Sequence, residues 1–134
     1  MEVLASRVLI RPTDPGRSKR FYRDTLGLPV YREFGDPENP GLVFFLGGGF
    51  LEVSGRSQTP VQGGVAIWVQ VRDVRTEHRR LEAAGVPVAR GPQREPWGLV
   101  EMWLTDPDGL RIVMVEVPAD HPLRLDQRGL RDDT

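Results

Sequence analysis

One pattern occurs twice along this chain: RVLIRPTD at residues 7–14 and AIWVQVRD at residues 66–73. Each copy is followed by a helix-like run and then by a matching segment, LGLPV at residues 26–30 and AGVPV at residues 84–88. Asp14 corresponds to Asp73, and the second copy is one residue shorter between its aspartate and its glycine. A repeat of this kind indicates two copies of one supersecondary unit, and it constrains the architecture more firmly than local propensity does.

The first copy predicts the element order β-α-β-β-β. Alternating apolar residues predict a strand at residues 7–11. Asp14-Pro15 is typical of a helix start, because the carboxylate caps free N–H groups and proline suits the first helical position. We expect this helix to end at Gly27, which tolerates the left-handed conformation of a helix stop. Strands are expected at residues 28–34, 42–46 and 50–53, the last two joined by a tight hairpin of three glycines.

The second copy predicts the same order, with a strand at residues 65–71, a helix at 74–84 and strands at 86–89, 99–105 and 110–117. Asp106-Pro107-Asp108-Gly109 predicts a type I turn before the last strand. A four-stranded sheet with one helix covers only one of its faces, so each half leaves the other face open. We therefore predict an α+β fold of tandem βαβββ modules with curved mixed sheets around a cleft. The modules span residues 1–58 and 59–118 of one structural domain, and residues 119–134 form a polar C-terminal tail.

Composition excludes several classes of protein. At 134 residues the chain has the length of one domain, and the absence of cysteine excludes disulfides and thiolate metal sites. The net charge of −1 with mixed signs argues against nucleic acid and anionic membranes as partners. No signal peptide or apolar span is evident, so we expect a soluble cytoplasmic protein. Of the 18 basic residues only Lys19 is a lysine, which we attribute to a GC-rich coding genome.

A set of residues spread over both halves resembles a known family. They are Asp14, Ser18, Phe21-Tyr22-Arg23-Asp24, Leu26-Gly27-Leu28, Pro96-Trp97-Gly98, Asp106-Pro107-Asp108-Gly109 and Arg111. In this order they resemble the vicinal oxygen chelate superfamily of glyoxalases, bleomycin resistance proteins and extradiol dioxygenases, from about Arg7 to Glu116. The resemblance implies the tandem-module fold predicted above. That superfamily includes lyases, epimerases, dioxygenases, thiol transferases and non-catalytic drug binders, so the fold alone does not select a function.

The resemblance also implies where a metal would bind. Metal-dependent members hold a divalent ion with one residue from the first and one from the last strand of each half, and these positions are Arg7, Glu52, Ala66 and Val113. Only Glu52 offers a donor atom for a cation. A divalent ion needs three or four nitrogen or oxygen ligands, so we expect no metal and no other cofactor. We interpret His78 as an ordinary helix residue and His121 as a residue of the tail.

Strand alternation selects the side chains that face the predicted cleft, and Trp97 is added from the loop at its rim. The candidate ligand-binding residues are Arg7, Arg11, Phe50, Glu52, Trp68, Gln70, Trp97, Trp103 and Arg111. Arg7 either forms an ion pair with Glu52 or, like Arg11, receives an anionic group of a ligand. Trp68 and Trp103 either fill the core or stack on a flat ligand.

Three functions remain open. The leading hypothesis is a metal-independent small-molecule-binding protein of the sequestration or resistance type. The second is a metal-dependent lyase or dioxygenase of the same superfamily. The third is a metal-free enzyme with Glu52 or Glu101 as the general base, the catalytic residues being otherwise unknown. The resemblance further implies a homodimer, in which modules pair within one chain or across two.

Overall fold

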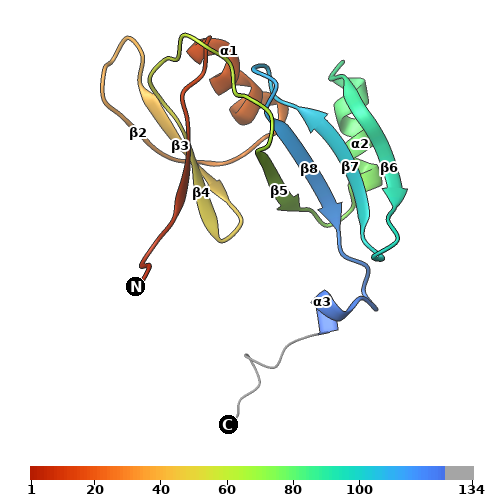
Figure 1. The fold of residues 1–134 in the computed structure, drawn as a ribbon. Coiled ribbons are helices and arrows are strands. Elements are labelled where there is room, and N and C mark those ends of the chain that lie inside the picture. Colours follow the sequence, from red (N-terminus) through yellow and green to blue (C-terminus); the bar gives the residue numbers. More distant parts are fainter. Residues whose placement is uncertain (126–134) are drawn as a thin grey trace. The chain divides into compact units, whose positions relative to one another are not determined.

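The computed structural model describes residues 1–125, and the chain divides into two compact units. One unit comprises Met1–Ile67 together with Thr105–Ile112, and the other comprises Trp68–Leu104 together with Val113–Thr134. The chain builds two mixed four-stranded sheets with few helices (Figure 1). The predicted α+β class and the repeated β-α-β-β-β order are therefore confirmed. Residues 126–134, which belong to the predicted tail, lie outside the described residues.

The first sheet has the strand order β1-β4-β3-β2. Its strands are β1 (Arg7–Ile10), β2 (Val30–Phe34), β3 (Gly41–Leu46) and β4 (Gly49–Val53). β1 and β4 pair in parallel, whereas β3 pairs antiparallel with both β2 and β4. The parallel pair brings the two ends of the module together at one edge of the sheet, although 45 residues separate Arg7 from Glu52.

Alternation along the strands gives the first sheet two different faces. The apolar face carries Phe44, Leu51 and Val53, which are fully buried. It is covered by α1 (Pro15–Arg20) and the π-helix η1 (Phe21–Thr25), with the Tyr22 ring centroid 6.3 Å from that of Phe44. The opposite face carries the charged and aromatic side chains considered below as a candidate site.

The first helix starts as predicted but changes its winding halfway. The Asp14 carboxylate accepts a hydrogen bond from the Arg17 N–H at 3.1 Å, and Pro15 occupies the first turn. From Phe21 onward the helix is a π-helix, closed by a bond from the Leu26 N–H to the Phe21 carbonyl at 2.8 Å. The wider winding is compatible with burying the consecutive residues Phe21 and Tyr22. The next strand begins at Val30 rather than at residue 28.

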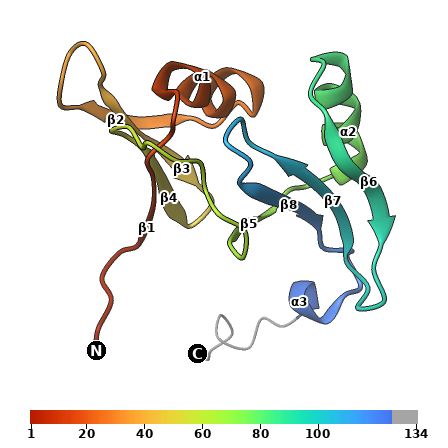
Figure 2. The same cartoon turned by 45° about the horizontal axis from the view of Figure 1, so that its top comes forward.

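The second sheet has the order β5-β8-β7-β6. Its strands are β5 (Ala66–Gln70), β6 (Val88–Arg94), β7 (Val100–Thr105) and β8 (Arg111–Glu116), and the remaining helices are α2 (Val74–Ala83) and α3 (Pro122–Leu125). α2 runs beside β6 in both ribbon views (Figures 1 and 2). Asp73 caps α2 by accepting from the Thr76 N–H at 3.1 Å, and this bond holds the pKa of Asp73 below its usual value. No helix within residues 1–125 is long and apolar enough to cross a membrane.

The prediction for β6 was wrong in its limits. The sequence pattern indicated a strand at residues 86–89 followed by a loop, whereas β6 extends from Val88 to Arg94. Gly91 and Pro92 suggest a loop, but here they lie within a strand whose register against β7 shifts twice. Such irregularities break the two-residue alternation on which strand prediction depends.

The turn between β7 and β8 is anchored to the first helix by buried carboxylates. The Gly109 N–H donates to the Asp106 carbonyl at 2.9 Å, and Gly109 has a φ of +92°, as the predicted turn requires. The Tyr22 hydroxyl donates to Asp106 Oδ2 at 2.6 Å. Asp108 accepts from the backbone N–H of Thr13 at 2.7 Å and from the Thr13 hydroxyl. The first unit therefore includes this turn, although the turn follows the repeat's second helix in the sequence.

Replacing Tyr22 by phenylalanine tests this anchor. The change leaves Asp106 Oδ2 without its hydroxyl donor, so we expect the free energy of unfolding at neutral pH to fall by about 1–3 kcal/mol in urea denaturation. Burial, and then the charge of Asp106, raises the pKa of Tyr22 far above its ordinary value of 10.0. Because the folded protein keeps this proton while the unfolded chain loses it, the wild type loses stability as pH rises above about 10.

In the Tyr22→Phe variant, this part of the loss of stability at alkaline pH should be absent. Tyr31→Phe is the matched control, because Tyr31 is half-exposed. Equal stability of both variants at neutral pH, or an equal alkaline loss in the wild type and Tyr22→Phe, would contradict the proposed role of the anchor.

Candidate functional site

An ion pair between β1 and β4 lies on the polar face of the first sheet. Arg7 Nη1 donates to Glu52 Oε1 at 2.8 Å, which confirms the predicted pair. Glu52 is only 8% exposed, so its carboxylate needs such partners. Its second oxygen, Oε2, accepts from the Ser54 hydroxyl at 2.6 Å, and Arg11 Nη1 lies 3.8 Å from the same oxygen. Arg11 in turn donates to the Ser54 oxygen at 2.8 Å.

This set of donors determines the protonation of Glu52. The Ser54 hydroxyl, followed by Arg7, holds the pKa of Glu52 below its usual value and outweighs the effect of burial. The carboxylate is therefore anionic at neutral pH. A general base working near neutral pH needs the opposite change, a raised pKa, so this environment is unfavourable for the role of base.

Three aromatic rings lie next to the ion pair, and we call them the aromatic cluster: Tyr31, Phe45 and Phe50. The ring centroid of Tyr31 is 5.1 Å from that of Phe45 and 4.9 Å from that of Phe50. The Arg7 guanidinium carbon lies 6.0 Å from the Phe50 centroid. Tyr31 is 49% exposed and Phe45 is 43% exposed, so these rings present apolar surface to solvent.

Sequence analysis identified only Phe50 in this cluster. Phe45 pairs with Phe50 across β3 and β4 and alternates with the buried Phe44, so the period of β3 carried a signal for it. Tyr31 lies at a register shift between Val30 and Arg32, where alternation does not predict which face a side chain takes.

A second group of candidates surrounds Glu101 in the other unit. The Trp97 indole N–H donates to Glu101 Oε2 at 2.9 Å, and the Trp103 N–H donates to Oε1 at 3.4 Å. Glu101 is buried. The Arg90 guanidinium carbon lies 3.8 Å from the Trp103 ring centroid, and Arg90 also pairs with Glu95 at 2.6 Å. Trp103 is therefore held between a carboxylate and a cation.

The remaining candidates are Trp68, Gln70 and Arg111. Trp68 on β5 is 51% exposed, so it does not fill the core as one interpretation had it, and Gln70 on the same strand is also exposed. Arg111 on β8 is partly buried. Of the nine candidates, the first unit contains Arg7, Arg11, Phe50, Glu52 and Arg111, and the second contains Trp68, Gln70, Trp97 and Trp103.

The residues at the four positions that the resemblance implied for a metal are not suited to bind an ion. The Glu52 carboxylate is already bound by Arg7 and Ser54. A guanidinium offers only donors, and the side chains of Ala66 and Val113 offer no ligand atom. Within residues 1–125 no group of three or more His, Cys, Asp or Glu side chains gathers where an ion could bind.

Both histidines have contacts inside the second unit. His121 Nε2 lies 2.9 Å from the Trp97 carbonyl, and its Nδ1 accepts from the Leu123 N–H at 3.1 Å. His78 Nε2 lies 3.5 Å from Glu82 on the same helix. These contacts tie His121 to the loop that carries Trp97.

The sequence matches the Glyoxalase/Bleomycin resistance protein/Dioxygenase superfamily over residues 5–114. Because the match covers most of the chain, the protein belongs to this superfamily. Arg7 and Glu52, two of the four positions that the resemblance implied for a metal, form the ion pair described above. No curated protein matches the sequence.

Several solved structures share the fold. TnmS3, an antibiotic binding protein from Streptomyces sp. CB03234, has a TM-score of 0.72 and 22% identity, over 87% of this chain and 98% of that one. A superfamily member from Sphaerobacter thermophilus DSM 20745 has a TM-score of 0.68 and 24% identity, over 86% and 98%. The lactoylglutathione lyase from Agrobacterium tumefaciens has a TM-score of 0.63 and 22% identity, over 87% and 94%. At these identities the likeness establishes the fold alone.

Replacing Ser54 by alanine tests how the Glu52 charge is maintained. Without the hydroxyl, the pKa of Glu52 should rise toward its ordinary value of 4.5, which carboxyl NMR titration measures. Since the folded pKa is depressed, the stability that Glu52 contributes is present above pH 4.5 and is lost as pH falls through the folded pKa. Ser54→Ala should lose part of that contribution.

Ser57→Ala is the matched control, because the Ser57 hydroxyl bonds to the Thr59 carbonyl. An unchanged Glu52 pKa in Ser54→Ala, or the same rise in Ser57→Ala, would show that the hydroxyl does not set this charge.

Proposed function

We propose that this protein binds and sequesters a small organic molecule with a flat apolar body and an anionic group, and does so without a metal. The observation that carries the proposal is the exposed aromatic cluster beside the Arg7–Glu52 pair. Monomeric proteins rarely leave aromatic rings grouped at the surface without a use for them. A cluster bordered by fixed charges has the composition of a ligand pocket, in which apolar walls bind and a few polar groups orient.

In the proposed complex the flat body of the ligand stacks on the rings of the aromatic cluster. Arg7 and Arg11 receive the anionic group, since each uses Nη1 for its contact with Glu52 or Ser54 and has further N–H donors. The side chains of Arg7 and Arg11 are 36% and 50% exposed, so a ligand can reach them. Glu52 and Ser54 hold the two guanidinium groups in place, which reduces the ordering cost of binding.

The proposed ligand contacts also include the remaining candidates, which are Trp68, Gln70, Trp97, Trp103 and Arg111. Trp68 and Trp97 are exposed indoles, which suit stacking on the same class of ligand. The family supports a homodimer, and a cytoplasmic location is part of the same proposal. TnmS3, described as an antibiotic binding protein, supports ligand binding on this fold.

The second candidate is a lyase, because a lactoylglutathione lyase has the same fold. The residues at the metal positions argue against a metal-dependent version of that reaction, since Glu52 is already paired with Arg7. For a metal-free enzyme, the depressed pKa of Glu52 argues against its use as the base. Glu101 has both oxygens engaged by indole N–H groups. Binding without turnover is therefore the function we favour.

A ligand panel tests the binding proposal. Aromatic carboxylates and their uncharged amides are compared by thermal shift, and affinities of the compounds that bind are measured by calorimetry. We expect the anionic member of each pair to bind more tightly. Tyr31→Ala and Phe45→Ala should each weaken binding by about tenfold or more, as truncation of an aromatic contact does.

Leu123→Ala truncates an exposed apolar side chain elsewhere and should leave the affinity unchanged. Mass spectrometry of the ligand after incubation should recover it intact. Full affinity in both aromatic variants, or conversion of the ligand, would overturn the proposal of a sequestering site built on the aromatic cluster.

Metal content tests the second part of the proposal. Protein purified without a chelator should contain well under one divalent ion per chain by inductively coupled plasma mass spectrometry, because only one of the four positions offers a donor. Near-stoichiometric zinc, nickel, manganese or iron would contradict metal independence.

A further inference from the structure

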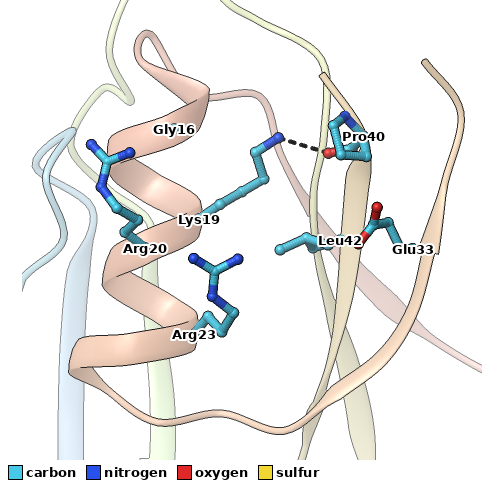
Figure 3. A pocket seen from close by; sticks show the side chains of 7 residues that line it. All are labelled: Gly16, Lys19, Arg20, Arg23, Glu33, Pro40 and Leu42. Atoms are coloured by element: carbon cyan, nitrogen blue, oxygen red, sulfur yellow. Dashed lines mark hydrogen bonds between the residues drawn. The ribbon is translucent and has the colours of Figure 1, made fainter. Parts of the chain in front are cut away.

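A pocket lies on the helix-covered side of the first sheet. It has a volume of about 240 Å³ and is lined by Gly16, Lys19, Arg20, Arg23, Glu33, Pro40 and Leu42 (Figure 3). The residues come from α1 and η1 on one side and from β2, β3 and the loop between them on the other. The pocket shares no residue with the aromatic cluster or the Arg7–Glu52 pair. It is smaller than the roughly 300–1,000 Å³ of pockets for drug-sized molecules, so a small ion suits it better.

The only lysine of the chain lies in this pocket. Lys19 extends from the helix toward the β2–β3 loop (Figure 3), where its Nζ donates to Asn39 Oδ1 at 2.9 Å and to the Pro40 carbonyl at 2.7 Å. Both acceptors are neutral, and within residues 1–125 Lys19 forms no ion pair. Burial lowers the pKa of Lys19, which Arg23 lowers further and Glu33 partly restores.

Two arginines add positive charge to the same pocket. Arg23 donates from Nε and Nη2 to its neighbour Asp24 at 2.9 and 3.1 Å, which leaves Nη1 for another acceptor. The Arg20 side chain has no hydrogen bond or ion pair within the described part of the chain, and its Nη1 lies 3.1 Å from where a side chain at Gly16 would begin. Three cations thus line the pocket with one carboxylate, Glu33. Arg23 is close enough to lower the pKa of Lys19, so these two like charges repel each other, and an anion between them would remove that cost.

We propose that this pocket binds an oxyanion of two negative charges, either inorganic phosphate or the phosphate group of a larger molecule. The third N–H of Lys19 and the guanidinium groups of Arg20 and Arg23 donate to its oxygens. Guanidinium and ammonium groups are the side chains that bind phosphate in proteins, through charge-assisted hydrogen bonds. The site is independent of the proposed function, because it uses a different face of the sheet.

The single lysine makes a direct experiment possible. Protein labelled with ¹³C-lysine gives one set of side-chain NMR signals, all from Lys19. Inorganic phosphate should shift these signals in a saturable way and raise the pKa of Lys19, since a nearby anion favours the charged amine. Sodium chloride at equal ionic strength should not. Comparing the affinity for glycerol phosphate with that for inorganic phosphate shows whether the pocket prefers a phosphate ester or free phosphate. Acetate tests whether a single negative charge is enough for binding.

Charge-removing variants locate the site. Arg20→Gln and Arg23→Gln should each weaken phosphate binding by about tenfold, as loss of a charge-assisted contact does. Arg75→Gln removes the same charge from an exposed position on α2 and should leave phosphate binding unchanged. All of these side chains are exposed, so the variants are expected to fold. The absence of a saturable shift in the wild type, or an equal loss in Arg75→Gln, would overturn the proposal, whatever the result for the aromatic cluster.

Discussion

The ion pair of Arg7 and Glu52 is the interaction on which the account of this protein depends. It joins the first strand of a module to its last strand, which pair in parallel at one edge of the sheet. A carboxylate that is almost fully buried is costly unless it is paired and hydrogen-bonded, and here Arg7, Ser54 and Arg11 surround it. The same contacts keep Glu52 anionic and hold two guanidinium groups next to exposed aromatic rings.

We propose that this arrangement separates the chain from the metal-dependent members of its superfamily. A guanidinium is always protonated and cannot act as a ligand, so the cation that balances Glu52 is part of the protein itself. Any metal at this place would have to displace Arg7 and find ligands that Ala66 and Val113 do not supply. The fold accommodates both enzymes and binding proteins, and it is the local set of residues that distinguishes between them.

Much of the fold was predictable because the sequence repeats its signals. The aspartate caps, the glycine helix stops and the Asp106–Gly109 turn each define an element boundary with a known conformational cause. The limits of β6 were missed because Gly91 and Pro92 resemble a loop, and the π-helical turn was missed because its signal is not distinct from that of an α-helix. The anchor between Tyr22 and Asp106 joins residues 84 apart, which no local pattern reveals.

The candidate site was predictable only in part, for similar reasons. The regular alternation of β1 and β4 placed Arg7, Phe50 and Glu52 on one face, and their pairing followed. Tyr31 lies at a strand irregularity and was missed, although it completes the aromatic cluster. The sequence singled out Lys19 only as the one lysine of the chain. Its surroundings were not predicted, because its two neutral acceptors belong to a loop whose position cannot be derived from sequence.

Anomalous diffraction tests the central claim most directly. Crystals would be soaked with zinc or nickel, and data would be collected at the absorption edge of the metal. The account predicts no anomalous peak within bonding distance of Glu52, with Arg7 Nη1 still in contact with the carboxylate. A metal bound to Glu52, with Arg7 turned away from it, would contradict the account.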